Sequence, residues 1–222
     1  MLALGLVAAA AVTASAHRKD EYLQASRIAI ESGRVQMEID LTPGIAVAED
    51  VLKQIDTDRS GSVSDAEADA YAASVMRAVA LEVDGRPLAP YLVDRVWPTV
   101  EAVRQGEGSM RLRLSALMPP LGAGAHHLRY HNAHRPDIGV YLANALVPSS
   151  DRVAITDQQR DVDQRALRID YVLRADAAAL RSQWIAPGLI GLAMASALLR
   201  LSRISRRGSG RLRGRTPGAA PT

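Results

Sequence analysis

The chain has 222 residues, no cysteine, and a formal net charge of +3 at pH 7. This length is sufficient for one domain with a substantial core, and the lack of cysteine excludes disulfides, thiolate metal sites and a cysteine nucleophile. All 24 acidic residues precede residue 181, whereas eight of the 27 basic residues lie from residue 181 onward. Because these arginines have no interleaved aromatic residues, they argue against a nucleic-acid-binding domain.

The first 16 residues, MLALGLVAAAAVTASA, are uncharged and mostly apolar. They end in Ala14-Ser15-Ala16, the small-x-small pattern of a secretory cleavage site. Residues 1–16 are therefore predicted to be a signal peptide, and the mature chain to begin at His17. Since no positive charge precedes the apolar stretch, a start further upstream and an uncleaved anchor are the alternatives.

Residues 17–180 are predicted to form an extracytoplasmic, β-rich domain. Val35, Met37, Ile39 and Leu41 alternate with polar residues, which is the pattern of a half-buried strand. An apolar stretch at 22–30 precedes this strand and is joined to it through a Glu-Ser-Gly turn, a hairpin signal. Further strands are predicted at 81–83, 110–114, 128–130, 140–147, 153–156 and 167–173. Eight or nine short strands predict a mainly β fold, a β-sandwich with a helix-loop-helix inserted between its second and third strands.

Residues 56–67, with the sequence DTDRSGSVSDAE, match the calcium-binding loop of an EF-hand. Such a loop supplies oxygen ligands from positions 1, 3, 5, 7, 9 and 12, and has glycine at position 6 where the chain turns sharply. Gly61 takes the glycine position. The ligand positions hold Asp56, Asp58, Ser60, Ser62 (through its carbonyl), Ser64 (through a water) and Glu67. Ser60 replaces the usual Asp or Asn, which removes one negative charge.

Helical patterns flank this loop on both sides, so an EF-hand with Ca²⁺ as its cofactor is predicted over 46–80. Val47, Val51, Leu52 and Ile55 recur at helical spacing before the loop, and residues 66–80 are rich in helix formers. Three carboxylates in an unpaired loop predict weak binding, on the order of 10⁻⁴–10⁻³ M as in extracellular modules, and a structural use of calcium. The alternative is a solvated acidic turn without an ion.

Histidines form a second candidate metal site. His17 would combine a free α-amino group with its imidazole, and four more histidines lie within nine residues, at 126, 127, 131 and 134. Residues on one strand face recur every second position, so His127 and His131 are expected to point together. Together with His17 they would bind Cu, Ni or Zn, as in a periplasmic accessory protein that handles transition metals. Ordinary polar contacts are the alternative for all of them.

No catalytic residues are predicted, because the chain has no G-x-S-x-G elbow, no H-E-x-x-H motif and no glycine-rich phosphate loop. We therefore do not expect an enzyme. A protein-recognition module, in which a β-sheet binds an unidentified partner and calcium only fixes the structure, is a further alternative.

An apolar run near the C-terminus predicts a membrane anchor. Residues 182–199 are 18 consecutive uncharged residues, which span about 27 Å as a helix, near the minimum for a bilayer. Trp184 stands at its start, and arginines at 200, 203, 206 and 207 follow it. A single transmembrane helix is thus predicted at 181–201, in the cytoplasmic membrane, with the N-terminal domain outside and a disordered basic tail at 202–222 in the cytoplasm. A buried core helix is the alternative.

Two segments carry a family resemblance. Residues 17–25 (HRKDEYLQA) and residues 135–148 (RPDIGVYLANALVP) resemble a bacterial family of secreted, membrane-anchored proteins. In that family this start, a single EF-hand and one C-terminal span share a chain, and no activity is assigned. A looser similarity extends to the extracytoplasmic parts of hydrogenase- and urease-accessory membrane proteins. The resemblance implies the architecture and the calcium loop.

Overall fold

The computed structural model describes residues 20–175. The predictions for the signal peptide, for His17, for the transmembrane helix at 181–201 and for the tail at 202–222 lie outside these residues. Within residues 20–175, no helix is both long enough and apolar enough to cross a membrane.

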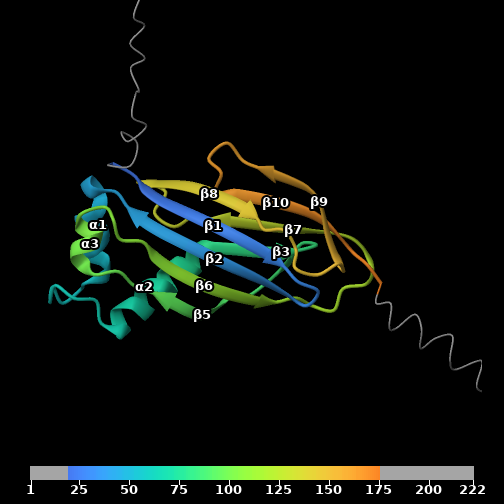
Figure 1. Cartoon of the computed structure of the whole chain (residues 1–222), viewed down its shortest axis with the longest axis horizontal. Coiled ribbons are helices and arrows are strands. Elements are labelled where there is room, and N and C mark those ends of the chain that lie inside the picture. The colour runs from blue at the N-terminus through green and yellow to red at the C-terminus, as the bar shows by residue number, and fades with distance from the viewer. Residues whose placement is uncertain (1–19, 176–222) are drawn as a thin grey trace, which may run out of the picture. The chain divides into compact units, whose positions relative to one another are not determined.

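The mainly β fold is confirmed, because the described residues form two five-stranded sheets, drawn as two overlying layers in Figure 1. In hydrogen-bonded order, sheet A consists of β5 (Tyr91–Val96), β6 (Met110–Leu117), β2 (Arg34–Pro43), β1 (Tyr22–Ile30) and β8 (Gly139–Ala145). Sheet B consists of β4 (Arg86–Pro87), β3 (Val79–Val83), β7 (Gly124–Asn132), β10 (Ala166–Leu173) and β9 (Val153–Arg160).

The two sheets enclose one hydrophobic core, to which buried side chains of both contribute, as in a β-sandwich. Along β1, buried and partly buried residues alternate over all nine positions, because successive side chains of a strand point to opposite faces. Polar groups on this inner face are paired: the hydroxyls of Ser26 and Tyr130 lie 2.7 Å apart and join the two sheets.

Strand β1 pairs on one side with β2 in antiparallel fashion and on the other side with β8 in parallel. The parallel register places Tyr22 opposite Gly139, and the Tyr22 amide donates to the carbonyl of Ile138 at 2.9 Å. The described parts of the two segments that carry the family resemblance, far apart in sequence, are therefore neighbours in sheet A.

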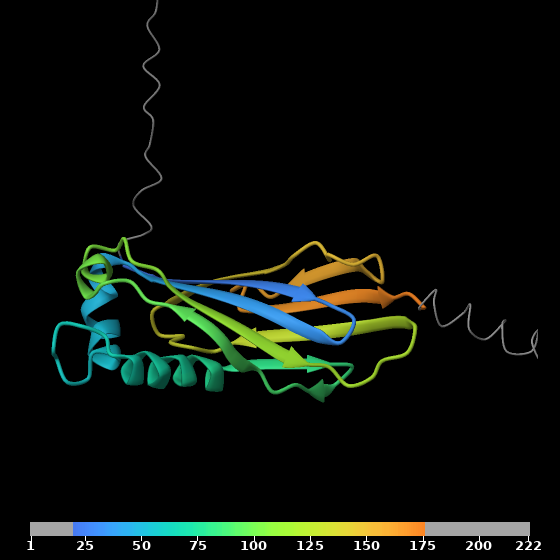
Figure 2. The same ribbon diagram turned by 60° about the horizontal axis from the view of Figure 1, so that its bottom comes forward.

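A helical insertion carries the chain from sheet A to sheet B at one end of the sandwich (Figure 2). Helix α1 (Ile45–Ile55) follows β2 after a single connecting residue, and α2 (Asp65–Ala78) continues directly into β3. The expected second helix reached residue 80, so its end was wrong by two residues. Val79 and Ala80 instead pair with β7, because the ladder with β7 outweighs the helical preference of the segment.

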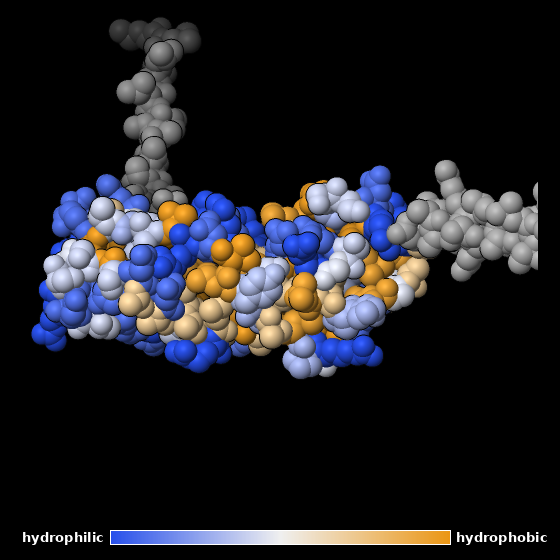
Figure 3. Space-filling view, turned by 90° about the horizontal axis from the view of Figure 1, so that it is seen from below, coloured by the Kyte–Doolittle hydropathy of each residue, from blue (hydrophilic) through white to orange (hydrophobic). Residues whose placement is uncertain are grey.

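Three elements were absent from the expected set: the two-residue strand β4, the edge strand β5 and the short helix α3 (Val100–Arg104). Helix α3 packs against α1 in a small cluster separate from the main core, formed by Ala48, Leu52, Val100 and Val103. Strand β5 exposes apolar side chains, and hydrophobic residues gather in the middle of the side on which it lies (Figure 3).

Candidate metal site

The loop at 56–64 joins α1 to α2, and its own side chains fix its conformation. The carboxylate of Asp56 accepts hydrogen bonds from the backbone amides of Ser60 and Gly61, both at 2.9 Å. Gly61 has a φ of +79°, a conformation that costs a residue with a Cβ about 1–2 kcal/mol. The sharp turn predicted at this glycine is therefore formed.

Helix α2 begins with a capping box. Ser64 is the N-cap, and its hydroxyl accepts from the amide of Glu67 at 3.3 Å while the Glu67 carboxylate accepts from the amide of Ser64 at 3.0 Å. These two bonds satisfy amides that the first helical turn leaves without partners. The capping sequence thus determines where α2 starts and holds Glu67 at the end of the loop.

Glu67 also reaches back to the start of the loop. Its Oε1 accepts from the amide and the hydroxyl of Thr57, at 2.7 and 3.0 Å, and from the amide of Asp58 at 3.3 Å. These hydrogen bonds, with those from Ser64 as the largest cause, lower the pKa of Glu67 to about 2. The side chain is therefore a carboxylate at neutral pH, the form that a metal ion requires.

Three carboxylates converge in this loop. One oxygen from each of Asp56, Asp58 and Glu67 lies within 4.8 Å of the others, and among residues 20–175 no other group of three or more His, Asp or Glu side chains meets this condition. Two nearby cations pair with other acids, since Arg104 bonds Glu49 at 2.7 Å and Lys53 bonds Asp50 at 3.0 Å. The three ligands could therefore hold a metal ion.

The serines of the loop add neutral oxygens. The Ser60 hydroxyl donates to the carbonyl of Ser62 at 3.0 Å, so the predicted ligands at positions 5 and 7 are neighbours in the structure. Ser64 differs from these two serines, because its hydroxyl donates to the carboxylate of Glu67 in the capping box. The donor set contains oxygen alone, which suits a hard cation.

The two sides of the loop are anchored differently. Helix α2 is fixed to the sandwich by Tyr71, which is 3% exposed and whose hydroxyl bonds the Tyr22 hydroxyl at 2.8 Å and Nε2 of His134 at 3.1 Å. Helix α1 packs in part against α3 in the separate cluster. Val63, within the loop, packs against both this cluster and the main core. A cation in the loop would join these two anchored parts.

The structure does not bring the expected histidine ligands together. His127 and His131 lie on the same outer face of sheet B, opposite Asp170 and Ala166 of β10. Four residues of extended strand separate their Cα atoms by about 13 Å, and side chains stand roughly perpendicular to the sheet. The two rings are therefore not directed at one ion, which would need metal bonds of about 2 Å to both. His17, the third expected ligand, lies outside the described residues.

His126 and His134 make ordinary polar contacts. His126 places its ring nitrogens 2.8 Å from a carboxylate oxygen of Asp84 and 2.9 Å from the carbonyl of Gly122. Two acceptors favour the doubly protonated ring, and the bond to Asp84 is the main cause of its raised pKa. His134 is buried, with its Nε2 bonded to Tyr71.

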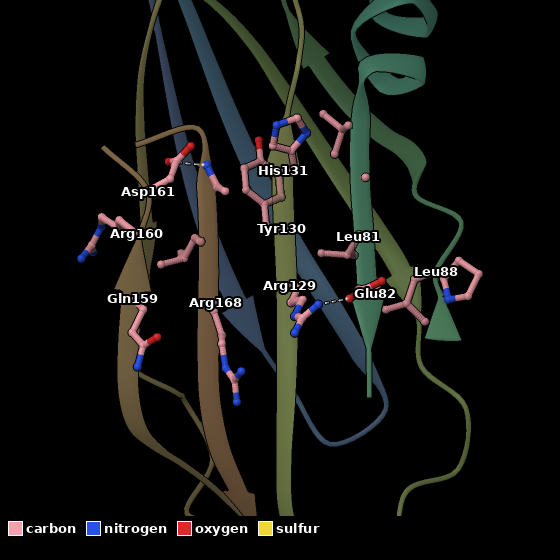
Figure 4. Close-up of a pocket in the computed structure, with 15 residues that line it drawn as sticks. Leu81, Glu82, Leu88, Arg129, Tyr130, His131, Gln159, Arg160, Asp161 and Arg168 are labelled. Atoms are coloured by element: carbon pink, nitrogen blue, oxygen red, sulfur yellow. Dashed lines mark hydrogen bonds and ion pairs between the residues drawn. The ribbon is translucent and has the colours of Figure 1, made fainter. Parts of the chain in front are cut away.

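A hollow of about 560 Å³ on the outer face of sheet B also contains His131 (Figure 4). Small residues cause it, because Ala80 and Ala166 lie on either side of His131 across three strands. Its charged groups include the pair Arg129–Glu82 at 3.4 Å. This is the mixed, solvated face expected on the outside of a sandwich.

Thr57 and Tyr71 contribute to the site beyond what the sequence indicated. Thr57 occupies a position of the loop pattern that any residue can take, so nothing in the sequence marked it as a donor to Glu67. Tyr71 lies within the predicted second helix, but the partners of its hydroxyl, Tyr22 and His134, are distant in sequence, so the sequence did not indicate them.

Comparison with family models, with curated proteins and with solved structures finds no match for this chain. The function is therefore inferred from the site itself.

Proposed function

We propose that this protein is a calcium-binding extracytoplasmic domain, with residues 56–67 acting as the loop of a single EF-hand. The observation that carries the proposal is the convergence of Asp56, Asp58 and Glu67 within 4.8 Å, at loop positions 1, 3 and 12 and between two helices. An oxygen-only donor set with three carboxylates suits Ca²⁺ rather than the metals that prefer imidazole or thiolate.

In this proposal calcium binds weakly and is used structurally. Glu67 already accepts five hydrogen bonds, two from Ser64, two from Thr57 and one from Asp58. An incoming ion has to compete with these donors, which lowers the net gain from binding. We therefore expect a dissociation constant on the order of 10⁻⁴–10⁻³ M, typical of extracellular modules.

The location proposed for the domain follows from the ends of the sequence. A signal peptide at 1–16 would export it, and a single transmembrane helix at 181–201 would anchor it in the cytoplasmic membrane with the calcium loop outside. The uncharged run at 182–199 and the arginines after it support this proposal.

Isothermal titration of the purified protein with Ca²⁺ tests the function. Wild type should bind one ion in the range given above, and Glu67→Gln should weaken binding at least about tenfold because it removes a charged ligand. Glutamine still completes a capping box, so this variant keeps the start of α2.

Asp50→Asn is the matched control, because Asp50 is an exposed acid of α1 whose partner is Lys53. It removes the same charge outside the ligand set and should leave the affinity within about twofold of wild type. Absence of heat at millimolar Ca²⁺, or equal binding by Glu67→Gln, would contradict the proposal.

A further inference from the structure

Arg95 of β5 clamps the first turn of α2. Its Nε donates to a carboxylate oxygen of Asp69 at 2.6 Å, and its Nη2 donates to the carboxylate and the carbonyl of Asp65 at 3.0 and 3.2 Å. Asp65 and Asp69 are four residues apart and so lie on the same face of the helix, one turn from each other. One guanidinium therefore spans the turn that contains Glu67.

Strand pairing fixes the backbone of Arg95. Arg95 lies opposite Leu112 of β6, and β6 in turn pairs with β2 along eight residues. The Arg95 side chain is only 21% exposed. It reaches Asp69 through Nε and Asp65 through Nη2, two donors of one planar group. A planar guanidinium makes such contacts in a fixed geometry, which lysine cannot reproduce.

The other ligands of the proposed calcium site are held by a different helix. Asp56 and Asp58 follow α1, which packs both into the main core and against α3 in the separate apolar cluster. The distance between these aspartates and Glu67 therefore depends on how α2 is fixed to the sandwich. Tyr71 fixes the middle of α2, and Arg95 fixes its first turn.

We propose that Arg95 is a positioning residue for calcium binding, because it holds Glu67 at the correct place relative to Asp56 and Asp58. This inference rests on the proposed function. Charge alone predicts the opposite effect, since Arg95 is a cation near a cation site and neutralises two carboxylates. Its removal would then tighten binding, by about twofold at physiological ionic strength.

The two effects separate in the variants Arg95→Lys and Arg95→Ala, titrated with Ca²⁺ as the full-length protein. If Arg95 positions Glu67, both variants should bind Ca²⁺ about tenfold more weakly, as is common when a residue supporting a metal ligand is lost. Arg113→Lys is the matched control. Arg113 lies on neighbouring β6 and pairs with Asp94 at 3.0 Å, so its change should leave the affinity unaltered.

Calcium-free melting temperatures complete the test. The side chains of Asp65 and Asp69 are 94% and 60% exposed, and ion pairs with such surface acids contribute little to stability. Arg95→Lys should therefore melt within a few degrees of wild type while its affinity falls. Unchanged affinity in Arg95→Lys, or tighter binding by Arg95→Ala, overturns the positioning role and leaves the calcium site standing. If wild type itself takes up no Ca²⁺, the proposed function fails and the inference with it.

Discussion

His134 is the histidine whose surroundings change its chemistry most. It is 6% exposed, its ring stands edge-on to those of Tyr22 and Tyr71, and its Nε2 bonds the Tyr71 hydroxyl. Burial is the main cause that lowers its pKa to about 4, and the charge of Arg135 acts in the same direction. His134 is therefore neutral under ordinary conditions.

This histidine should make the protein lose stability in mild acid. The unfolded chain binds a proton at His134 below about pH 6.5, whereas the folded protein does so only below about pH 4. The stability from His134 is thus complete above pH 6.5 and is lost as the pH falls to 4. A shift of this size corresponds to about 3 kcal/mol of unfolding free energy.

Urea denaturation at several pH values checks this expectation against His134→Gln, whose stability should be lower at pH 7 and flatter between pH 4 and 6.5. His126 acts in the opposite sense, because its pKa is raised. Its contribution is complete below pH 6.5 and is lost as the pH rises through its folded pKa. A slope between pH 4 and 6.5 that is as steep in His134→Gln as in wild type would refute the assignment.

At this scale the loop was predictable and the histidines were not. Asp56, Asp58 and Glu67 belong to one local pattern, so their spacing along the chain already implies their convergence. The four histidines at 126–134 are equally close in sequence, but strand alternation and the end of β7 direct them into three different environments. Local spacing describes a loop better than it describes a strand.

Among the elements, β8 is an edge strand whose backbone is covered by side chains of the other sheet. The Nε of Arg160 in β9 donates to the carbonyl of Ala143 at 2.7 Å, and the amide of Ala145 donates to Oε1 of Gln158 at 3.3 Å. The same strand exposes Leu142 at 40%. An apolar edge with free backbone groups is a template for intermolecular pairing, so these contacts protect β8.

Arg160→Ala should therefore promote self-association while changing the unfolding free energy by only about 1 kcal/mol. Size-exclusion chromatography with light scattering, over a range of protein concentrations, measures the effect relative to wild type. Arg168→Ala is the control, since Arg168 lies on the inner strand β10 and pairs with Asp170 at 2.9 Å. Identical elution of the two variants would show that Arg160 does not prevent self-association through the edge of β8.

Missed elements have a physical explanation. The six residues of β5 are exposed or only partly buried, so the alternation of buried and exposed residues that identifies β1 and β2 is weak there. Helix α3 has five residues, too few to display a 3.6-residue period. A periodic sequence pattern arises because one face of an element is buried. Strand β5 and helix α3 are too exposed or too short to show such a pattern.

At the scale of the whole molecule, the sequence predicted a sandwich with a helical insertion, but not the order of its strands. Hairpin signals indicate antiparallel neighbours such as β1 and β2, because the turn between them is short. No local signal indicates that β1 also pairs with β8. That contact depends on the complementarity of two surfaces formed by distant segments.

This parallel pairing has a consequence for the time course of folding. The first strand of the sandwich has one partner that is synthesised immediately after it and another that emerges only when most of the chain is complete. Contacts between distant segments form slowly, because closing a long loop costs entropy before any bond rewards it. During folding, the backbone hydrogen bonds between β1 and β2 should therefore form early, and those between β1 and β8 should form later.

The time at which the amides of β1 become protected during refolding should alternate from residue to residue. The amide of Tyr22 and the carbonyl of Ile28 bond the β8 side, so by the alternation of strands the even-numbered residues of β1 face β8 and the odd-numbered residues face β2. In pulse-labelling hydrogen exchange during refolding, amides of residues 23, 25, 27 and 29 should gain protection before those of 24, 26 and 28. Simultaneous protection would instead mean that both partners dock in one step.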